Sequence, residues 1–456
     1  MRKIFQYILM AVAVVVTASC SNELDETLQS AGNGNLQFVV SDFPTFGEST
    51  QTRAIGTQDE GKTAWENGDE IIVTLISQKY GEQAVALTYN GSSWSTEASL
   101  SYLENETPSV SVFYAPCYEV TEEGTMQLRS GMQLGMTEYL SGNYEIENGI
   151  MTITFEGAIR DYSRLRIAGL ANQTLTVTTT DFTPAGATEV ATAAYTLTTD
   201  NNGNASLFGV FAEDATVSVK QGDVTLKDYT FTAEKNPNGT EHNKSYALDA
   251  TPVIDGTLGG KATAEESDIT ALVKQLKAYV DNGITTIIVP GSEPALIEMD
   301  LWTNTAIGEA IYRLSGSDDY DENNPYNGKI DLILQDVTEI VDQEFYSAWA
   351  LNSITLPKVI KIGDEAFHRT WFLKTLTFES VLTEVNETGG VMFAQVGKEV
   401  DGCNLFINCG QMKENSIPTP DLTTNTWKFK FENEFKSITL THTGENSECD
   451  ECNALQ

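Results

Sequence analysis

Short stretches in which apolar and polar residues alternate recur between about residues 36 and 250. Alternation at every second position predicts half-buried strands, and the Gly, Asn, Asp and Pro residues between the runs predict turns. Threonine is abundant here, which suits a half-buried pleated surface. The clearest runs are 71–75, 110–114, 150–155, 175–177 and 217–219. This region is therefore expected to be all-β, with two β-sandwiches that divide near Gly149.

A different pattern begins near Thr251. Five apolar residues fall at the spacing of one helix face: Ile269, Leu272, Val273, Leu276 and Val280. Gly283 follows at the point where a helix end favours a left-handed residue. A strand is expected next, over 285–289.

Beyond that strand the same residue types return every 22 positions. Six positions repeat at this step, in the sets Leu332/Ile354/Leu376, Leu334/Leu356/Phe378, Ile340/Ile362, Phe345/Phe367, Trp349/Trp371 and Leu351/Leu373. The predicted unit is a short strand, a turn and a compact helical turn that carries the Phe. Less regular copies of the strand are expected over 404–408 and 435–440. Because the terminal unit of such a stack would expose its core, the preceding helix is expected to cover that end.

The N-terminus has the pattern of an export signal. Arg2 and Lys3 precede a run from Ile4 to Val16 that is apolar except for Gln6, and Thr17-Ala18-Ser19-Cys20 follows. The run is too short to span a bilayer of ~30 Å. The small residues before Cys20 resemble the lipobox of bacterial lipoproteins, with Thr17 in place of the usual Leu. That resemblance implies cleavage before Cys20, lipidation of its thiol and anchoring in the outer membrane; the alternative is an ordinary secretory signal.

Acidic, weakly hydrophobic residues follow Cys20 and predict a flexible tether. This stretch resembles the surface-export signal of some Gram-negative anaerobes, which implies outward display and not a periplasmic position. The whole chain has 27 basic and 65 acidic residues, a net charge of −38. Such a charge argues against nucleic acid as a partner and suits an extracellular surface.

Several short motifs before residue 250 resemble those of fimbrillin-like proteins, a family of fimbrial subunits and adhesins. Trp65-Glu66-Asn67-Gly68-Asp69-Glu70-Ile71 is similar to the family's Trp-x-x-Gly-Asp-x-Ile signature, and 52–54, 113–116 and 162–167 also fit. In this family, proteolysis near an early Arg frees a groove for a neighbour's strand, which implies processing at Arg53 and other fimbrial subunits as partners. The alternative is a loop arginine. Trp65 is expected to cover one end of the core.

The block 351–367 closely resembles the BspA-like leucine-rich repeat, whose fold is a one-sided solenoid. The resulting expectation is a mainly β chain: a fimbrillin-like β-sandwich region, then a short leucine-rich-repeat solenoid with a helical N-terminal cap. The expected parts are a signal peptide (1–20), an acidic tether (21–35), sandwiches (36–148 and 149–250), a helical cap (251–327), leucine-rich repeats (328–442) and an acidic cysteine-containing tail (443–456).

The repeated tryptophans are the strongest candidates for binding. Neighbouring strands of a sheet lie ~4.8 Å apart, so Trp349 and Trp371 are expected to sit one above the other. Exposed indoles in a ladder could bind a sugar ring or an apolar side chain. The alternative is that both indoles point inward and enlarge the core.

Other candidate chemistry is weak. Cys449 and Cys452 lie among acids, which favours inert thiols or a tail disulfide over redox chemistry or a metal site. Cys403 and Cys409 flank one predicted strand, so they are expected ~20 Å apart and unpaired with each other. A calcium loop over 319–330 lacks the required Gly and Glu.

No catalytic motif is present, and no catalytic residue, metal or cofactor is expected. The expected function is therefore adhesion or surface protein interaction, as a fimbrial tip or anchor component, with an unknown surface protein or glycan as ligand. The alternative is a glycan-binding surface lipoprotein of a nutrient-uptake system. Both functions rest on family resemblance.

Overall fold

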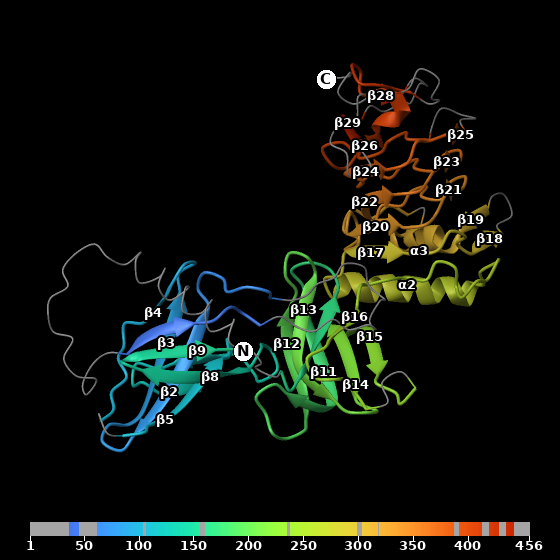
Figure 1. Cartoon of the computed structure of the whole chain (residues 1–456). Coiled ribbons are helices and arrows are strands. Elements are labelled where there is room, and N and C mark those ends of the chain that lie inside the picture. Colours follow the sequence, from blue (N-terminus) through green and yellow to red (C-terminus); the bar gives the residue numbers. More distant parts are fainter. Residues whose placement is uncertain are drawn as a thin grey trace. The chain divides into compact units, whose positions relative to one another are not determined.

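The computed structural model describes residues 36–44, 62–103, 106–155, 160–234, 238–298, 303–317, 319–386, 392–412, 419–427 and 435–441. The fold is mainly β, as expected (Figure 1). Two compact units make up the chain. The first contains Lys62–Gly131 and Tyr139–Ala158, and the second contains Met132–Glu138 and Ile159–Gln456. No helix in the described ranges is long and apolar enough to cross a membrane.

The first unit contains one seven-stranded sheet in the order β1-β9-β8-β5-β2-β3-β4. Its strands are β1 (Gln37–Val40), β2 (Glu70–Ser77), β3 (Gly81–Tyr89), β4 (Trp94–Ser95), β5 (Ser109–Tyr114), β8 (Leu140–Glu147) and β9 (Ile150–Thr154); β6 (Tyr118–Val120) and β7 (Met126–Leu128) form a separate hairpin. The predicted runs over 71–75, 110–114 and 150–155 are confirmed as parts of β2, β5 and β9. Neighbours pair antiparallel, except that β1 runs parallel to β9.

A second seven-stranded sheet follows, in the order β15-β14-β11-β13-β10-β16, with β12 also paired to β11. Its strands are β10 (Ser163–Ala168), β11 (Thr174–Pro184), β12 (Ala191–Thr198), β13 (Asn204–Phe211), β14 (Thr216–Gln221), β15 (Val224–Thr230) and β16 (Ser245–Asp249). β11 pairs with β14 through Thr176–Thr179 and with β13 through Phe182–Pro184. Between these parts Asp181 has a left-handed φ of 49°, so the strand breaks there and joins two layers around buried Phe182 and Phe211.

The structure corrects the predicted division between 148 and 149. Asn148 and Gly149 both have positive φ and form the tight turn between β8 and β9, whose first paired residues are Glu147 and Ile150. Asn-Gly between alternating runs is a strong hairpin signal, so this position lies inside one sheet. The second sheet begins at Ser163 instead.

The segment Met132–Glu138 precedes β8 in sequence but belongs to the second unit. The Phe208 amide donates to the Gly135 carbonyl at 2.8 Å. Buried Arg160 donates twice to one carboxylate oxygen of buried Glu138, at 3.0 and 2.8 Å. Removing one member of such a buried pair leaves an uncompensated charge, so the pair holds this crossing segment in place.

The rest of the second unit is built on a six-stranded, all-parallel sheet, here called the parallel region (Figure 1). Its strands, in spatial and sequence order, are β17 (Thr286–Val289), β20 (Ile330–Leu334), β22 (Leu351–Leu356), β24 (Thr375–Phe378), β26 (Asn404–Asn408) and β29 (Ser437–Thr441). A smaller parallel sheet contains β21 (Glu339–Ile340), β23 (Lys361–Ile362) and β25 (Glu384–Val385). We call each strand of the large sheet, with the chain up to the next such strand, a coil.

Equivalent residues of successive coils lie in register. Leu332 pairs with Ile354, which pairs with Leu376, and all three are fully buried. The rings of Phe345, Phe367 and Phe393 stack at centroid distances of 5.7 and 5.5 Å. The predicted 22-residue spacing therefore aligns the core side chains of neighbouring coils. The irregular strands expected at 404–408 and 435–440 are also confirmed, as β26 and β29.

The close approach of neighbouring coils restricts the residue type at Gly363. A Cβ atom there would lie 2.4 Å from the Asp342 backbone nitrogen and 2.6 Å from its carboxylate oxygen. The Gly363 amide donates to the Ile340 carbonyl at 2.7 Å, and the Asp364 amide donates to Asp342 at 2.7 Å. This turn therefore requires glycine for space and not for a left-handed backbone.

Two helices lie before the repeated strands. α2 (Glu266–Asp281) confirms the predicted helix, with Ile269, Leu272 and Leu276 buried and Gly283 at a left-handed φ of 74°. The sequence pattern missed α3 (Ala306–Leu314), because a helix of nine residues is too short for its apolar period to stand out.

A fully buried carboxyl group connects α3 to the coils. Thr305, the N-cap of α3, accepts from the Gly308 amide at 3.1 Å and donates to Glu344 at 2.8 Å. The other oxygen of Glu344 accepts from the Val341 amide at 3.1 Å. Burial raises the pKa of Glu344 to about 7, although these hydrogen bonds act in the opposite direction.

Because Glu344 is buried with a raised pKa, we expect the free energy of unfolding to fall as pH rises. The folded protein keeps the Glu344 proton up to about pH 7, whereas the unfolded chain releases it near pH 4.5. Its contribution is therefore fully present below pH 4.5 and is lost by pH 7, a change of about 3 kcal/mol in the free energy of unfolding. Urea unfolding at pH 5 and pH 8 measures this, with Glu344→Gln as the reference. We expect the wild type to lose about 3 kcal/mol more than Glu344→Gln between these pH values. Equal losses would contradict the assignment.

Candidate functional site

Trp349 and Trp371 stack as the repeat predicts. Their ring centroids lie 5.2 Å apart with an interplanar angle of 23°. The expectation of an exposed ladder is corrected, however, because Trp349 is 0% exposed and Trp371 only 8%. Both indoles follow the turn that carries the buried phenylalanine of their coil, and this turn directs them inward. They enlarge the core and cannot present their faces to a ligand.

Tyr320 covers the edge of this indole stack. Its ring contacts Trp349 at 5.0 Å and Trp371 at 4.8 Å, both edge to face, while the tyrosine itself is 37% exposed. Burial raises the pKa of the Tyr320 hydroxyl, and the nearby carboxylates of Glu399 and Glu322 raise it further. Tyr320 is thus an accessible aromatic group beside the buried indoles.

Two cations border the same cluster. The Arg369 guanidinium lies 5.1 Å from the Trp371 ring centroid and 5.8 Å from that of Tyr346, and it donates to the Tyr346 hydroxyl at 3.2 Å. The Lys398 ammonium lies 4.4 Å from the Trp371 centroid. Cations at these distances are attracted to the ring face. We call Tyr320, Tyr346, Arg369, Trp371 and Lys398 the aromatic–cation cluster.

A second cluster surrounds the signature tryptophan of the first unit. Trp65 packs edge to face against Phe43 at 4.8 Å, Trp94 at 4.9 Å and Phe155 at 5.6 Å. Phe43 and Phe155 follow β1 and β9, at one end of the strand order, whereas Trp94 opens β4 at the other end. Trp65 therefore holds together two opposite edges of a curved sheet, which confirms its expected place over the core's end.

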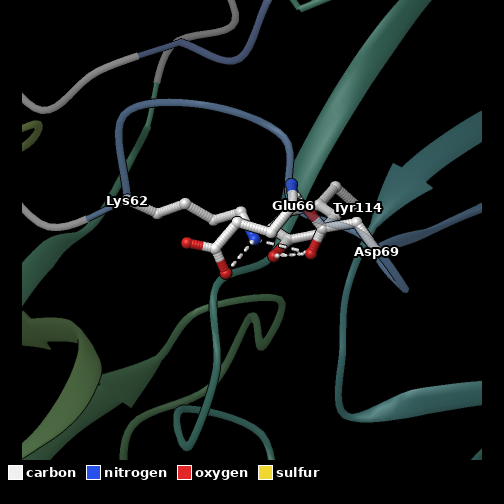
Figure 2. A network of polar contacts seen from close by, with 4 residues as sticks. All are labelled: Lys62, Glu66, Asp69 and Tyr114. Atoms are coloured by element: carbon white, nitrogen blue, oxygen red, sulfur yellow. Dashed lines mark hydrogen bonds and ion pairs between the residues drawn. The ribbon is translucent and has the colours of Figure 1, made fainter. Parts of the chain in front are cut away.

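Asp69 of the same signature collects polar contacts (Figure 2). Its carboxylate accepts from the Lys62 ammonium at 2.6 Å, from the Glu66 amide at 2.6 Å and from the Tyr114 hydroxyl at 3.3 Å. Lys62 and Asp69 are 18% and 11% exposed, so this pair is largely shielded from water. The Trp65 indole also donates to the Ser41 carbonyl at 2.7 Å. These contacts fix the segment before β2 and are structural.

The other candidate residues fall into two groups. Cys20, Arg53, Cys449 and Cys452 lie outside the described residues. Cys403 and Cys409 are not paired with each other, as expected, because Cys403 is a free thiol whereas Cys409 is disulfide-bonded. Burial raises the pKa of Cys403 to about 12, which makes its thiol unreactive.

In the part of the chain that the structure describes, no group of three His, Cys, Asp or Glu side chains could hold a metal ion. In the loop considered for calcium, Asp321 accepts instead from the Asn323 amide at 2.9 Å. Its backbone carbonyl accepts from the Asn327 side chain, also at 2.9 Å.

Comparison with known proteins gives little. No protein-family model and no curated protein matches the sequence. A structure described as that of a candidate cell adhesion protein from Bacteroides fragilis is 13% identical over 48% of this chain and 93% of its own, with a TM-score of 0.26. A mutant of the shaft pilin of Lactobacillus rhamnosus is 12% identical over 40% of this chain and 93% of its own, with a TM-score of 0.15. These TM-scores lie below the range in which two chains share a fold.

The contacts of Asp69 predict a local effect on stability. Asp69→Ala removes the acceptor of three donors, so we expect the first unit to lose about 2 kcal/mol of unfolding free energy. Glu66→Ala is the matched control, because this side chain is 76% exposed and lies 3.5 Å from Lys62. It should change stability by less than about 0.5 kcal/mol. Hydrogen exchange of the β2 amides measures both variants, and similar losses would contradict the role of Asp69.

Proposed function

We propose that this protein is a surface lipoprotein of a bacterial outer membrane that binds a partner outside the cell and performs no catalysis. Lipid at Cys20 would anchor the chain, and the acidic residues after it would act as tether and surface-export signal. Adhesion or surface protein interaction is the function that follows. The parallel region would provide the binding surface.

The in-register parallel sheet carries this proposal. Its outward positions form rows across the strands, such as Asp331, Ser353 and Thr375, or Ile333, Thr355 and Thr377. All six side chains are partly exposed. Rows held by backbone pairing form a rigid surface, which reduces the entropy lost on binding. The 22-residue step and this geometry support a leucine-rich-repeat solenoid of the BspA-like kind, with α2 and α3 as its cap.

The two other sheets would act as a base for the parallel region. Their strand content and the Trp65–Asp69 signature support a fimbrillin-like assignment, which suits a fimbrial tip or anchor component. Appended repeats suit such a terminal position better than a repeating shaft subunit.

A second function, glycan capture for nutrient uptake, is favoured by the aromatic–cation cluster. Exposed Tyr320 and the cations Arg369 and Lys398 provide the ring face and hydrogen-bond donors that sugars require. A strain without the gene that fails to grow on a polysaccharide but adheres normally would favour this second function over adhesion.

The proposal predicts that function depends on Cys20. A strain without the gene, complemented with wild type, should adhere to mucin-coated plates and present the protein to protease added to intact cells. Complementation with Cys20→Ala should give protein without lipid that is released from the membrane, so adherence should fall to the level of the deletion strain. Cys403→Ala is the matched cysteine control, because Cys403 is a free thiol, and it should adhere normally. Full adherence by Cys20→Ala cells would contradict the proposal.

Processing at Arg53 gives a separate prediction. β1 is an outer strand that pairs only with β9 in the described sheet, and the segment after it contacts Trp65 through Phe43. A cut after Arg53 would separate the rest of the chain from the piece that carries Cys20 and β1. These noncovalent contacts would then link the two pieces, so the lipid at Cys20 would still hold the protein. N-terminal sequencing of the surface protein should therefore find a chain that starts at Ala54. In the Arg53→Ala variant, no chain should start at this residue. A mature surface protein that still carries 36–53 would rule processing out.

A further inference from the structure

Ser347, Arg369 and Gln395 occupy the same place in three successive coils. The Ser347 amide donates to the His368 carbonyl, and the Arg369 amide donates to the Ala394 carbonyl, both at 2.9 Å. All three residues have left-handed φ angles, of 53°, 60° and 64°. Residues other than Gly, Asn and Asp are uncommon in this conformation, so a large side chain here is disfavoured by the backbone.

The Trp349 and Trp371 indoles lie beside this set of equivalent residues, and their hydrogen bonding differs. The Trp371 indole nitrogen donates to the Gln395 side-chain oxygen of the next coil at 3.0 Å. Beside Trp349, the equivalent residue of the next coil is Arg369, whose guanidinium has donors but no acceptor. The fully buried Trp349 indole nitrogen has no hydrogen-bond partner among the described residues. Arg369 therefore occupies a place where glutamine would satisfy the neighbouring indole, so the arginine is unfavourable for folding.

The guanidinium of Arg369 is also without a carboxylate partner among the residues that the structure describes. In a chain with 65 acidic residues, none of those in the described ranges forms an ion pair with it. One nitrogen donates to Tyr346, while Nε and the other terminal nitrogen have no partner in the same ranges. The rings of Tyr346 and Trp371 hold the group in place. Two ring contacts and one hydrogen bond are the structural gain of this arginine, and against them stand the disfavoured backbone and the unsatisfied indole. A residue that breaks local rules in this way is expected at a functional position.

We propose that Arg369, with Lys398 and Tyr320, binds the carboxylate of an acidic sugar at the end of a glycan. The planar guanidinium matches a carboxylate with two parallel hydrogen bonds. Lys398, whose ammonium lies 3.8 Å from the Glu399 carboxylate, adds a second cation beside it. Exposed Tyr320 offers a ring edge and face beside them for the apolar side of the sugar. This inference rests on the proposed surface function, because it names the partner class.

The negative charge around the cluster favours binding of a sugar with one carboxylate over binding of a polyanion. The carboxylates of Asp321, Glu322 and Glu399 lie close enough to affect Tyr320, and the chain carries a net charge of −38. An acidic polymer or an acidic peptide would meet these charges along its length, whereas a neutral glycan with one terminal acid would not.

The test is calorimetric binding to the detergent-solubilised full chain. The probes are sialyl-lactose, a disaccharide that ends in glucuronate, a glutamate-rich peptide, and lactose as the neutral reference. We expect at least one acidic probe to bind at least about tenfold more tightly than lactose, and Arg369→Gln to remove this preference. The same variant should keep or raise the melting temperature, because glutamine can accept from Trp349. Lys358→Gln is the matched control, since it removes a cation of the parallel region outside the cluster, and it should bind as wild type does.

Three results would overturn the assignment. These are equal affinity for acidic and neutral probes, unchanged binding by Arg369→Gln, and tighter binding of a glutamate-rich peptide than of either acidic sugar. None of them affects the adherence measured with Cys20→Ala cells. If the anchored wild type adheres while acidic sugars fail to bind, the surface function stands and only the partner class is wrong.

Discussion

Backbone pairing between successive coils, kept in register by a 22-residue step, is the constraint on which the parallel region depends. It aligns Leu332, Ile354 and Leu376 in one buried row and stacks the phenylalanine rings of three coils. It also restricts residue types, since the close approach at Gly363 leaves no space for a side chain. A shift of one residue would move each buried side chain to the outer face, so the pattern of buried residues enforces the register.

The candidate site is a consequence of the same stacking. Trp349 and Trp371 face each other because their coils are in register, and Arg369 approaches both Tyr346 and Trp371 for the same reason. The repeat also reveals what is unusual: Gln395 accepts from the Trp371 indole, whereas the Trp349 indole beside Arg369 has no partner in the described part of the chain. In the first unit, Trp65 and Asp69 have a comparable structural role without a repeat. They join the edges of a curved sheet and fix the segment before β2.

Sequence patterns predicted the parts of the fold that depend on local periodicity. The runs that became β2, β5 and β9, the helix α2 and the 22-residue rows were predictable, because each repeats an apolar residue at a fixed spacing. Phe393 was missed since it follows Phe367 by 26 residues, and α3 was missed since its nine residues are too few to show a clear helical period. The crossing of Met132–Glu138 into the second unit has no local signal. The exposure of the indoles could not be predicted either, because Tyr320 reaches them from a distant loop.

The central claim is that the parallel region, and not the two other sheets, carries the binding surface. Hydrogen–deuterium exchange of the full chain, with and without sialylated mucin, tests this claim most directly. The account predicts slower exchange in the amides of 343–350, 365–372 and 395–398, with the strands of the first two sheets unchanged. Slower exchange confined to the loops of those two sheets would contradict it and would place the binding surface in the sandwiches.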